Sequence, residues 1–425
     1  MRSIPQVVRA RGTIRVPPSK SYSARAILLA AMTTGETTIR GALDSDDTRY
    51  MLEAIRKIGF DVSGTFKTEL TIGERVSMSA NDVEIDVGMA GTAMRFLTGF
   101  LSFTPGRYIL KGDARMHERP IGDLVEALRS CTAEIEYLGS EGFPPLQIRG
   151  KIARGGFETR VNASTSSQFV SSIMMAATRL PGGITLNVES PVSASYLDIT
   201  RNMLVQFGAS VEDVGTNRIR VTAGKMQLDE FTVEADYSSA SYWMAAAAVT
   251  GGEVVLEGLS RDSVQGDRGF IDLLVSLGCT ARWSEGSLIF VGPEKLAGGS
   301  FDMNRMPDAA PTLAAIAPAA CEPILIHNIG NLRVKESDRI ASIATGLSLL
   351  GARCETGVDS IRIFPGWETG EAVIDPHGDH RIAMSFAIAG LARGGVSIDD
   401  ERVVSKSYPG FWRALDSLVE SSMKP

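Results

Sequence analysis

The sequence lacks the features of several large protein classes, and these absences narrow the possibilities first. Its 425 residues include only four cysteines, and none of them belongs to a Cys-x-x-Cys pair. We therefore interpret them as reduced thiols of a cytoplasmic protein. No run of about 18 or more uncharged apolar residues occurs, so no membrane-spanning helix is expected. The opening stretch MRSIPQVVRARGTIRVPPSK has no apolar segment, so no secretory signal or transit leader is expected either.

The sequence also lacks a net positive charge and the common nucleotide-binding motifs. The net charge is -7, whereas a nucleic-acid binder usually has a basic surplus. Neither Gly-x-x-x-x-Gly-Lys-Ser/Thr nor Gly-x-Gly-x-x-Gly opens a helix, which disfavours an ordinary nucleotide ligand. No paired His or Cys spacing indicates a metal site. His117, His327 and His377 are interpreted as surface or packing residues. We therefore expect no metal, no cofactor and no nucleic-acid partner.

What the sequence does contain is a sixfold repeat. Six times, an Ala-rich helical stretch runs into a turn and then a short β-branched strand, as in AILLAAMTTGETTIRG and YWMAAAAVTGGEVVLEG. The turn positions recur at intervals of 69 to 77 residues, and they are Gly35, Gly106, Gly183, Gly252, Pro323 and Gly395. Such regular spacing is typical of a chain built from similar structural units.

A second marker follows about 24 residues later in each unit, where another helix ends at a glycine and leads into a strand. Examples are MLEAIRKIGFDV and LLVSLGCTA, and in the second unit Cys131 stands where the others have glycine. The expected unit is strand–helix–strand–helix–strand. Three units make a plausible domain, so we expect two α/β domains. One would comprise residues 19–234, and the other residues 1–18 plus 235–425.

The first helix of each unit begins with small or capping residues, and several basic residues lie in the same polar motifs. Helix N-termini bind anions through free N–H groups. The alternative is that these residues only cap their helices. The motifs contain nine cations, namely Lys20, Arg25, Arg95, Arg115, Arg119, Lys335, Arg339, Arg381 and Lys406. They contain four acids, namely Asp308, Glu336, Asp338 and Asp379. This surplus of cations predicts a cleft for a ligand with more than one phosphate or carboxylate group.

Eight motifs in order then resemble the EPSP synthase family of enolpyruvyl transferases. They are PSKSYSARA, GMAGTAMRF, DARMHERPIGDL, STSSQF, DYSSASYW, MPDAAPT, NLRVKESDR and GDHRIAM. The resemblance covers residues from about 10 to 412. It implies a cytoplasmic transferase of the shikimate pathway and a target of glyphosate. It also implies two similar domains, each of three βαβαββ units with pseudo-threefold symmetry, of the inside-out α/β barrel type, which close around the substrates.

The resemblance also implies a reaction and its substrates. The enolpyruvyl group of phosphoenolpyruvate would be transferred to the 5-hydroxyl of 3-phosphoshikimate by addition and elimination, with release of phosphate. The small-molecule substrates would be the protein's only partners, and we expect a monomer.

Site residues follow motif by motif from the same resemblance. The phosphoshikimate ligands would be Lys20, Ser21, Arg25, Ser166, Ser167, Gln168, Ser193, Asp308, Asn331 and Lys335, with Tyr196 close by. The phosphoenolpyruvate ligands would be Lys20, Gly91, Arg119, Gln168, Arg339, Arg381 and Lys406. Glu336 and His380 match residues proposed to handle protons. Asp308 is the candidate base for the hydroxyl, and Lys20 and Glu336 are both candidates for protonating C3.

Two positions depart from the family pattern. Met89 replaces a frequent asparagine, and Phe96 replaces a frequent proline. Both border the family's phosphoenolpyruvate pocket, so they bear on affinity and on glyphosate sensitivity. The alternative function is transfer to UDP-N-acetylglucosamine by the sister enzyme. That enzyme typically has Lys-Asn in the first motif and a cysteine in the loop of the second unit. This chain has Lys20-Ser21 and no cysteine in GDARMHERP.

Overall fold

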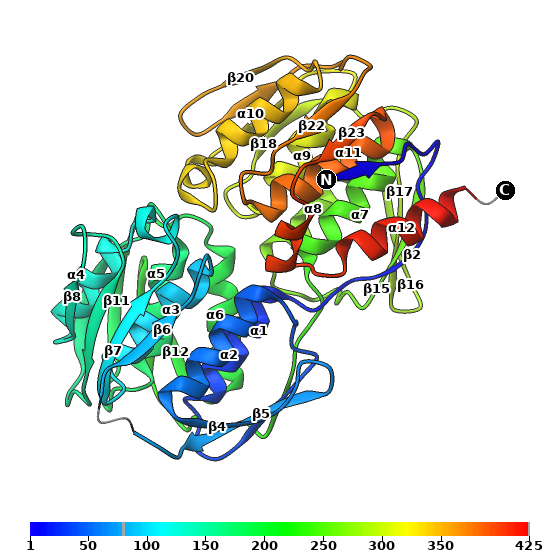
Figure 1. Ribbon diagram of the computed structural model, residues 1–425. Coiled ribbons are helices and arrows are strands. Elements are labelled where there is room, and N and C mark those ends of the chain that lie inside the picture. Colours follow the sequence, from blue (N-terminus) through cyan, green and yellow to red (C-terminus); the bar gives the residue numbers. More distant parts are fainter. Residues whose placement is uncertain (79–80, 424–425) are drawn as a thin grey trace. The chain divides into compact units, whose positions relative to one another are not determined.

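The computed structural model describes residues 1–78 and 81–423 (Figure 1). The chain divides into two compact units, which are Pro18–Val233 and the combination of Met1–Pro17 with Glu234–Pro425. Each unit has its own hydrophobic core. Among the described helices, none is long and apolar enough to cross a membrane.

In its described residues, the unit Pro18–Val233 contains three four-stranded sheets and six helices. The first sheet has the order β14 (Glu230–Thr232), β3 (Thr37–Arg40), β5 (Glu69–Arg75), β4 (Phe60–Gly64). The second has β6 (Val83–Asp86), β7 (Gly106–Lys111), β9 (Leu146–Gly150), β8 (Glu134–Tyr137), and the third has β10 (Phe157–Asn162), β11 (Ile184–Glu189), β13 (Arg218–Thr222), β12 (Ser210–Gly215). The helices are α1 (Lys20–Ala30), α2 (Asp46–Ile58), α3 (Gly91–Ser102), α4 (Gly122–Ser130), α5 (Ser167–Ala177) and α6 (Ser195–Gln206), with a 3-10 turn η1 (Met116–Glu118).

The other unit repeats this plan, except that its third sheet has three strands. Its sheets are β16 (Thr280–Ser284), β17 (Ser287–Val291), β15 (Glu253–Glu257), β2 (Arg11–Arg15), then β18 (Gly299–Asp302), β19 (Ile324–His327), β21 (Ile361–Ile363), β20 (Cys354–Thr356), and finally β1 (Arg2–Ile4), β23 (Val396–Ile398), β22 (Ala372–Ile374). Its helices are α7 (Tyr237–Thr250), α8 (Phe270–Ser276), α9 (Ala310–Ile316), α10 (Arg339–Leu349), α11 (His380–Arg393) and α12 (Phe411–Ser422). Its 3-10 turns are η2 (Gly266–Gly269), η3 (Ala317–Ala319), η4 (Gly330–Val334) and η5 (Glu401–Lys406).

Each four-stranded sheet contains one parallel pair followed by two antiparallel pairs. The parallel strands β6 and β7 are joined by α3, as a parallel crossover requires. In the first repeat of each unit, the parallel partner strand comes from a distant part of the sequence. In the unit Pro18–Val233, β3 pairs with β14 from the end of the unit, and in the other unit β15 pairs with the N-terminal β2. The arrangement is the expected βαβαββ repeat, and the predicted α/β class is confirmed.

The helices that open each repeat lie inside their unit. In α7, every residue from Tyr237 to Ala248 is buried, and α11 is buried from His380 to Leu391. A helix without a polar face is stable only when it is covered on all sides, and here alanine-rich sequences allow close approach of neighbours. By contrast, α2 exposes one face, and Arg56 and Lys57 lie in its last turn. The buried helices are thus surrounded by sheets, which is the inside-out arrangement.

One sequence-based assignment in the second repeat is wrong by one residue. Cys131 was expected where the other repeats have a helix-ending glycine, but Cys131 is the C-cap of α4, with φ -93. The left-handed residue is Thr132, with φ 68, and it corresponds to Gly59 in the first repeat, with φ 102. A threonine adopts this conformation at a cost that glycine avoids. Because the left-handed residue here is a threonine, no glycine marked the turn in the sequence.

Candidate functional site

The starts of three helices lie at one end of the unit Pro18–Val233. Near the N-termini of α3 and α5, Gln168 Nε2 donates to Thr92 Oγ1 over 3.1 Å. Further along the same two helices, Ser172 Oγ donates to the carbonyl of Arg95 over 2.6 Å, so the helices run parallel. In α1, Arg25 reaches Ser171 of α5, and α1 is therefore placed beside them. Free N–H groups of three helices are thereby gathered at one end, which favours an anion.

Arg25 is a buried cation within this cluster. Its Nε donates to Thr200 Oγ1 over 2.8 Å, and its Nη2 reaches Ser171 Oγ at 3.4 Å and the Tyr196 carbonyl at 3.3 Å. The guanidinium also stacks on the Phe96 ring, 4.9 Å from the centroid. Burial lowers the pKa of Arg25 to about 10. A buried guanidinium surrounded by hydroxyls is suited to bind a phosphate.

The guanidinium of Arg119 lies against Gly91, and this close approach requires a residue without a side chain at position 91. A Cβ on Gly91 would lie 2.6 Å from Arg119 Nη1, so only glycine leaves room for the guanidinium at the start of α3. Arg119 is buried and donates from Nη1 to the Met89 carbonyl over 3.4 Å. The substituted Met89 therefore meets Arg119 through its backbone.

The remaining predicted residues of this unit lie at the same helix starts. Ser166 caps α5, with its Oγ accepting from Gln168 N over 3.2 Å, and Ser167 is buried. Ser193, which precedes α6, is buried and has φ 52, an uncommon conformation for serine. Lys20 opens α1, and its Nζ lies 3.0 Å from Asp47 Oδ2.

Three helices of the other unit are also tied together close to their starts. Thr312 of α9 lies between Ser241 of α7 and Ser385 of α11, with hydroxyl separations of 3.3 Å and 3.4 Å. Asp236 caps α7 by accepting from Ser239 N, and Asp379 caps α11 by accepting from Arg381 N. In α1, α3 and α9, by contrast, no side chain of the N-cap residue makes a capping hydrogen bond. Capping alone therefore does not account for the polar residues at all six helix starts.

Arg339 is the centre of the charge network in this second cluster. The side chain is 2% exposed, and its nitrogens reach three carboxylates: Asp308 Oδ1 at 3.0 Å, Glu336 Oε2 at 2.9 Å and Asp379 Oδ2 at 2.7 Å. Burial by itself lowers the pKa of Arg339, but the three carboxylates outweigh burial and raise it. The residue is a permanent cation that orders three acids.

Asp308 is shared between two arginines. In addition to Arg339, Arg381 Nη2 donates to Asp308 Oδ2 over 2.7 Å, while Arg381 Nη1 lies 3.4 Å from the hydroxyl of Tyr242. Burial raises the pKa of Tyr242 to about 12, so the hydroxyl stays protonated. Asp308 thus holds a fixed position immediately before α9.

The other predicted residues of this unit lie along the same network. Lys406 Nζ is 3.8 Å from Glu336 Oε1, and His380 is fully buried, with Nδ1 3.7 Å from Asp379 Oδ1. Asn331 is buried in η4, and Lys335 is the C-cap of that turn.

The structure adds partners that the sequence did not reveal. Asp47 pairs with Lys20, and Glu118 pairs with Arg115 over 2.7 Å at the surface. Asp379, counted from the sequence among the acids and considered as a simple cap, also binds Arg339. Asp47 lies in a helix start outside the recognised motifs, so the sequence carried no signal for its pairing. These acids reduce the cationic surplus counted from the motifs.

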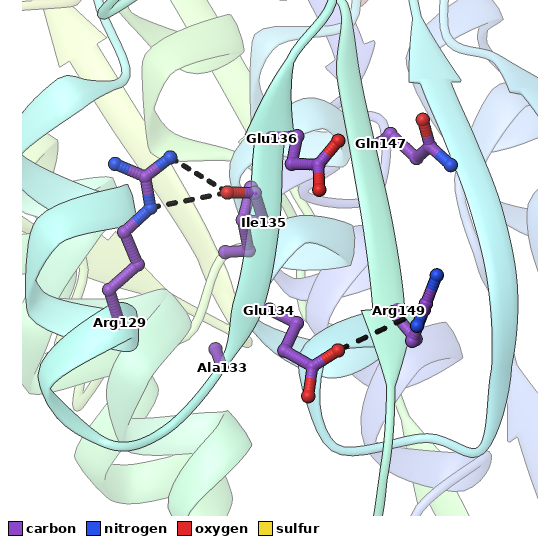
Figure 2. A pocket seen from close by; sticks show the side chains of 7 residues that line it. All are labelled: Arg129, Ala133, Glu134, Ile135, Glu136, Gln147 and Arg149. Atoms are coloured by element: carbon purple, nitrogen blue, oxygen red, sulfur yellow. Dashed lines mark hydrogen bonds and ion pairs between the residues drawn. The ribbon is translucent and has the colours of Figure 1, made fainter.

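Figure 2 shows a pocket with a volume of 340 Å³ that lies elsewhere, against β8 and β9. Three of its charged lining residues, Arg129, Glu134 and Arg149, are engaged by protein groups. Arg129 donates to the Ile135 carbonyl, and Arg149 Nε lies 3.8 Å from Glu134 Oε2. None of the residues predicted from the motifs lines this pocket.

Comparisons with known proteins agree with the motif assignment. The sequence model described as EPSP synthase (3-phosphoshikimate 1-carboxyvinyltransferase) matches residues 4–415. The 3-phosphoshikimate 1-carboxyvinyltransferase of Shewanella amazonensis is 41% identical over 420 residues, covering 97% of this chain and 98% of that protein. The same enzyme of Laribacter hongkongensis is 43% identical over 419 residues, covering 96% and 97%.

Solved structures show the same relationship. The EPSP synthase of Acinetobacter baumannii has a TM-score of 0.80 at 30% identity and covers 98% of this chain and 97% of its own. The enolpyruvyl transferase NikO from Streptomyces tendae has a TM-score of 0.73 at 15% identity, with coverage of 98% and 96%. At that identity, the second likeness concerns the fold alone.

Proposed function

The chain belongs to the EPSP synthase family, and we propose that the two clusters of helix starts described above carry out the family's reaction. This reaction transfers the enolpyruvyl group of phosphoenolpyruvate to the 5-hydroxyl of 3-phosphoshikimate and releases phosphate. The chain is accordingly a transferase of the shikimate pathway, which leads to the aromatic amino acids. The observation that carries the proposal is the position of Asp308, held by Arg339 and Arg381 at the start of α9.

Asp308 is the base in this proposal. The hydroxyl oxygen of phosphoshikimate attacks C2 of phosphoenolpyruvate, and its proton passes to the Asp308 carboxylate as the new C–O bond forms. C3 gains a proton at the same stage, giving a tetrahedral intermediate. The bond from C2 to the phosphate oxygen then breaks, C3 loses a proton, and the double bond is restored. Arg381 and Arg339 keep Asp308 ionised and oriented for the first step.

The acid that protonates C3 is Lys20 or Glu336. Lys20 is partly exposed beside Asp47, and it can present an ammonium proton from the start of α1. Glu336 is buried between Arg339 and Lys406. The variants Lys20→Met and Glu336→Gln separate these roles. Exchange of the C3 hydrogens with solvent is measured in each, because only loss of the true acid slows this exchange.

The unit Pro18–Val233 supplies most of the phosphoshikimate ligands in this proposal. The shikimate phosphate is bound by Ser21, Arg25, Ser166, Ser167, Gln168 and Ser193, whose backbone or side chains are grouped at the starts of α1, α5 and α6. Burial of Arg25 among hydroxyls supports this assignment, since a dianionic phosphate offsets the cost of burying the guanidinium. Asp308, Asn331 and Lys335 are the proposed ligands of the shikimate ring.

The proposed phosphoenolpyruvate ligands come from the two clusters of helix starts. Gly91 leaves room for Arg119 at the start of α3, and Gln168 lies beside Thr92 of the same helix. Arg339, Arg381 and Lys406 belong to the second cluster. These groups stabilise the carboxylate and phosphate of the tetrahedral intermediate, where preorganised donors have their largest effect. His380, buried next to Asp379, takes part in proton handling in this proposal.

Acceptor choice is tested by phosphate release from phosphoenolpyruvate. We expect release with 3-phosphoshikimate and none with UDP-N-acetylglucosamine. The opposite pattern would favour the sister enzyme's reaction.

We further propose that the two compact units are the two enolpyruvyl transferase domains, and that the enzyme is a cytoplasmic monomer. Sedimentation at enzyme concentrations used for kinetics tests the monomer.

A further inference from the structure

Asp267 is a buried carboxylic acid that is not among the proposed catalytic or substrate-binding residues. It lies in η2 and is 4% exposed. Its Oδ2 accepts a hydrogen bond from Ser238 Oγ over 2.7 Å, but its Oδ1 has no hydrogen-bond partner in the described part of the chain. Buried carboxyl oxygens are normally satisfied, so this half-satisfied group requires an explanation.

The fold holds Asp267 close to the Asp308–Arg381 pair. A Cβ on Gly269 of the same turn would lie 3.7 Å from Met306 Sδ, two residues before Asp308. Ser238, the partner of Asp267, lies one helical turn before Tyr242, which meets Arg381. The turn itself is braced on α7, because Gln265 Oε1 accepts from Tyr237 N over 3.0 Å. Asp267 is therefore kept in place from both sides.

The charged groups around Asp267 come from every neighbouring element. The segment before α9 contributes Asp308, α11 contributes Arg381, and the N-cap of α7 contributes Asp236. Arg268 and Asp272 lie on η2 and α8, and both are exposed. Burial raises the pKa of Asp267 to about 7, the negative charge of Asp308 acts in the same direction, and Arg381 opposes them.

We propose that Asp267 is a positioning residue for the enolpyruvyl transfer, whose negative charge makes the Asp308 carboxylate a better proton acceptor. Two carboxylates that share a site favour protonation of one of them. A carboxylate is a weak base for an alcohol, so a neighbouring negative charge helps at the step where the hydroxyl proton leaves. The inference rests on the proposed role of Asp308 as the base.

The test is the pH dependence of kcat in Asp267→Asn. We expect kcat of the parent enzyme to rise as the pH passes through the pKa of Asp267, which burial raises to about 7. Asparagine stays neutral at every pH, so the variant loses this rise, and its kcat on the alkaline side is about tenfold lower, the effect of one pKa unit in base strength. KM for phosphoshikimate stays at the parent value. Asp267→Glu recovers the rise, and Asp272→Asn, which changes an exposed acid five residues later, keeps the parent profile.

Ser238→Ala provides a second variant that does not alter the carboxyl group. It removes the hydrogen bond that stabilises the charged form of Asp267, so the rise in kcat moves to higher pH. Parent-like profiles in Asp267→Asn or in Ser238→Ala would overturn the inference. If Asp267→Asn fails to fold, the Ser238→Ala profile decides. A parent-like kcat in Asp308→Asn would instead remove the base assignment, an outcome distinct from failure of the Asp267 role alone.

Discussion

Arg381 Nη2 donates to Asp308 Oδ2 over 2.7 Å, so the proposed base and a proposed ligand of phosphoenolpyruvate are direct partners. A carboxylate or phosphate bound at Arg381 competes with Asp308 for the same guanidinium. We expect binding of the anion to weaken the Arg381–Asp308 pair and to leave Asp308 freer to accept a proton. The proposal therefore links substrate binding to base strength through this one ion pair.

Arg339→Ala should destabilise the enzyme. In the structure Arg339 is buried and pairs with Asp308, Glu336 and Asp379. Removing it takes the arginine partner away from the fully buried Asp379 and one of two cations away from Asp308 and Glu336, which costs about 3–5 kcal/mol. Urea unfolding measures the loss.

The matched control for Arg339 is Arg402→Ala. Arg402 is 87% exposed and pairs with Asp400 over 2.9 Å, and exposed pairs contribute about 0–1 kcal/mol. Equal midpoints of unfolding for the two variants would contradict the structural role of Arg339.

Gly91→Ala should impair phosphoenolpyruvate binding without unfolding the protein. The new methyl group would meet the Arg119 guanidinium at 2.6 Å, and the flexible end of that side chain must move away. Loss of a charge-assisted contact raises KM for phosphoenolpyruvate about 10- to 150-fold. Steady-state kinetics and thermal unfolding, run side by side, separate the two effects.

Gly122→Ala is the control for that variant. Gly122 opens α4, and a Cβ there lies 3.4 Å from Gly142 Cα, which is ordinary contact. It should leave KM unchanged. A Gly91→Ala enzyme with the parent KM would show that Arg119 does not bind this substrate.

Local patterns predicted the repeats well, because they depend on neighbours in the sequence. The helix starts at Lys20, Ser167, Tyr237 and His380 follow residues that were recognised as capping or small. The left-handed turn at Thr132 could not be located, since a non-glycine residue adopts it only when tertiary structure enforces it. Strand exchange, as in β14 pairing with β3 across the whole unit, likewise leaves no local signal.

The site was predicted less completely than the fold. Motif residues such as Asp308 and Arg381 were identified individually, but their direct pairing depends on helices far apart in sequence. The partners Asp47 and Asp267 were missed, because an aspartate at a helix start or in a turn is ordinary. Only burial distinguishes them from surface acids.

Asp267 should make folding stability depend on pH. Its folded-state pKa of about 7 lies above the ordinary value of 3.8, so the folded chain retains a proton that the unfolded chain releases between these values. Stability from this group is therefore present at acid pH and is lost as the pH rises towards about 7. The Asp267→Asn variant does not lose stability in this way, because asparagine does not titrate. The free energy of unfolding of the variant minus that of the parent should therefore increase by about 2–5 kcal/mol from acid to neutral pH. Denaturant unfolding in a pH series checks this, and parallel curves for the two proteins would refute it.

The most direct measurement for the account is kcat of Asp308→Asn, together with calorimetric binding of phosphoshikimate. Asparagine keeps the size of the side chain and its hydrogen bonding to one arginine, but it cannot accept the hydroxyl proton. With Asp308 as the base, we expect kcat to be lower by about 10²–10⁴-fold while phosphoshikimate still binds. Asp302→Asn, an exposed change six residues earlier, should behave like the parent. An Asp308→Asn enzyme with the parent kcat would contradict the account, because the base would have to be another group.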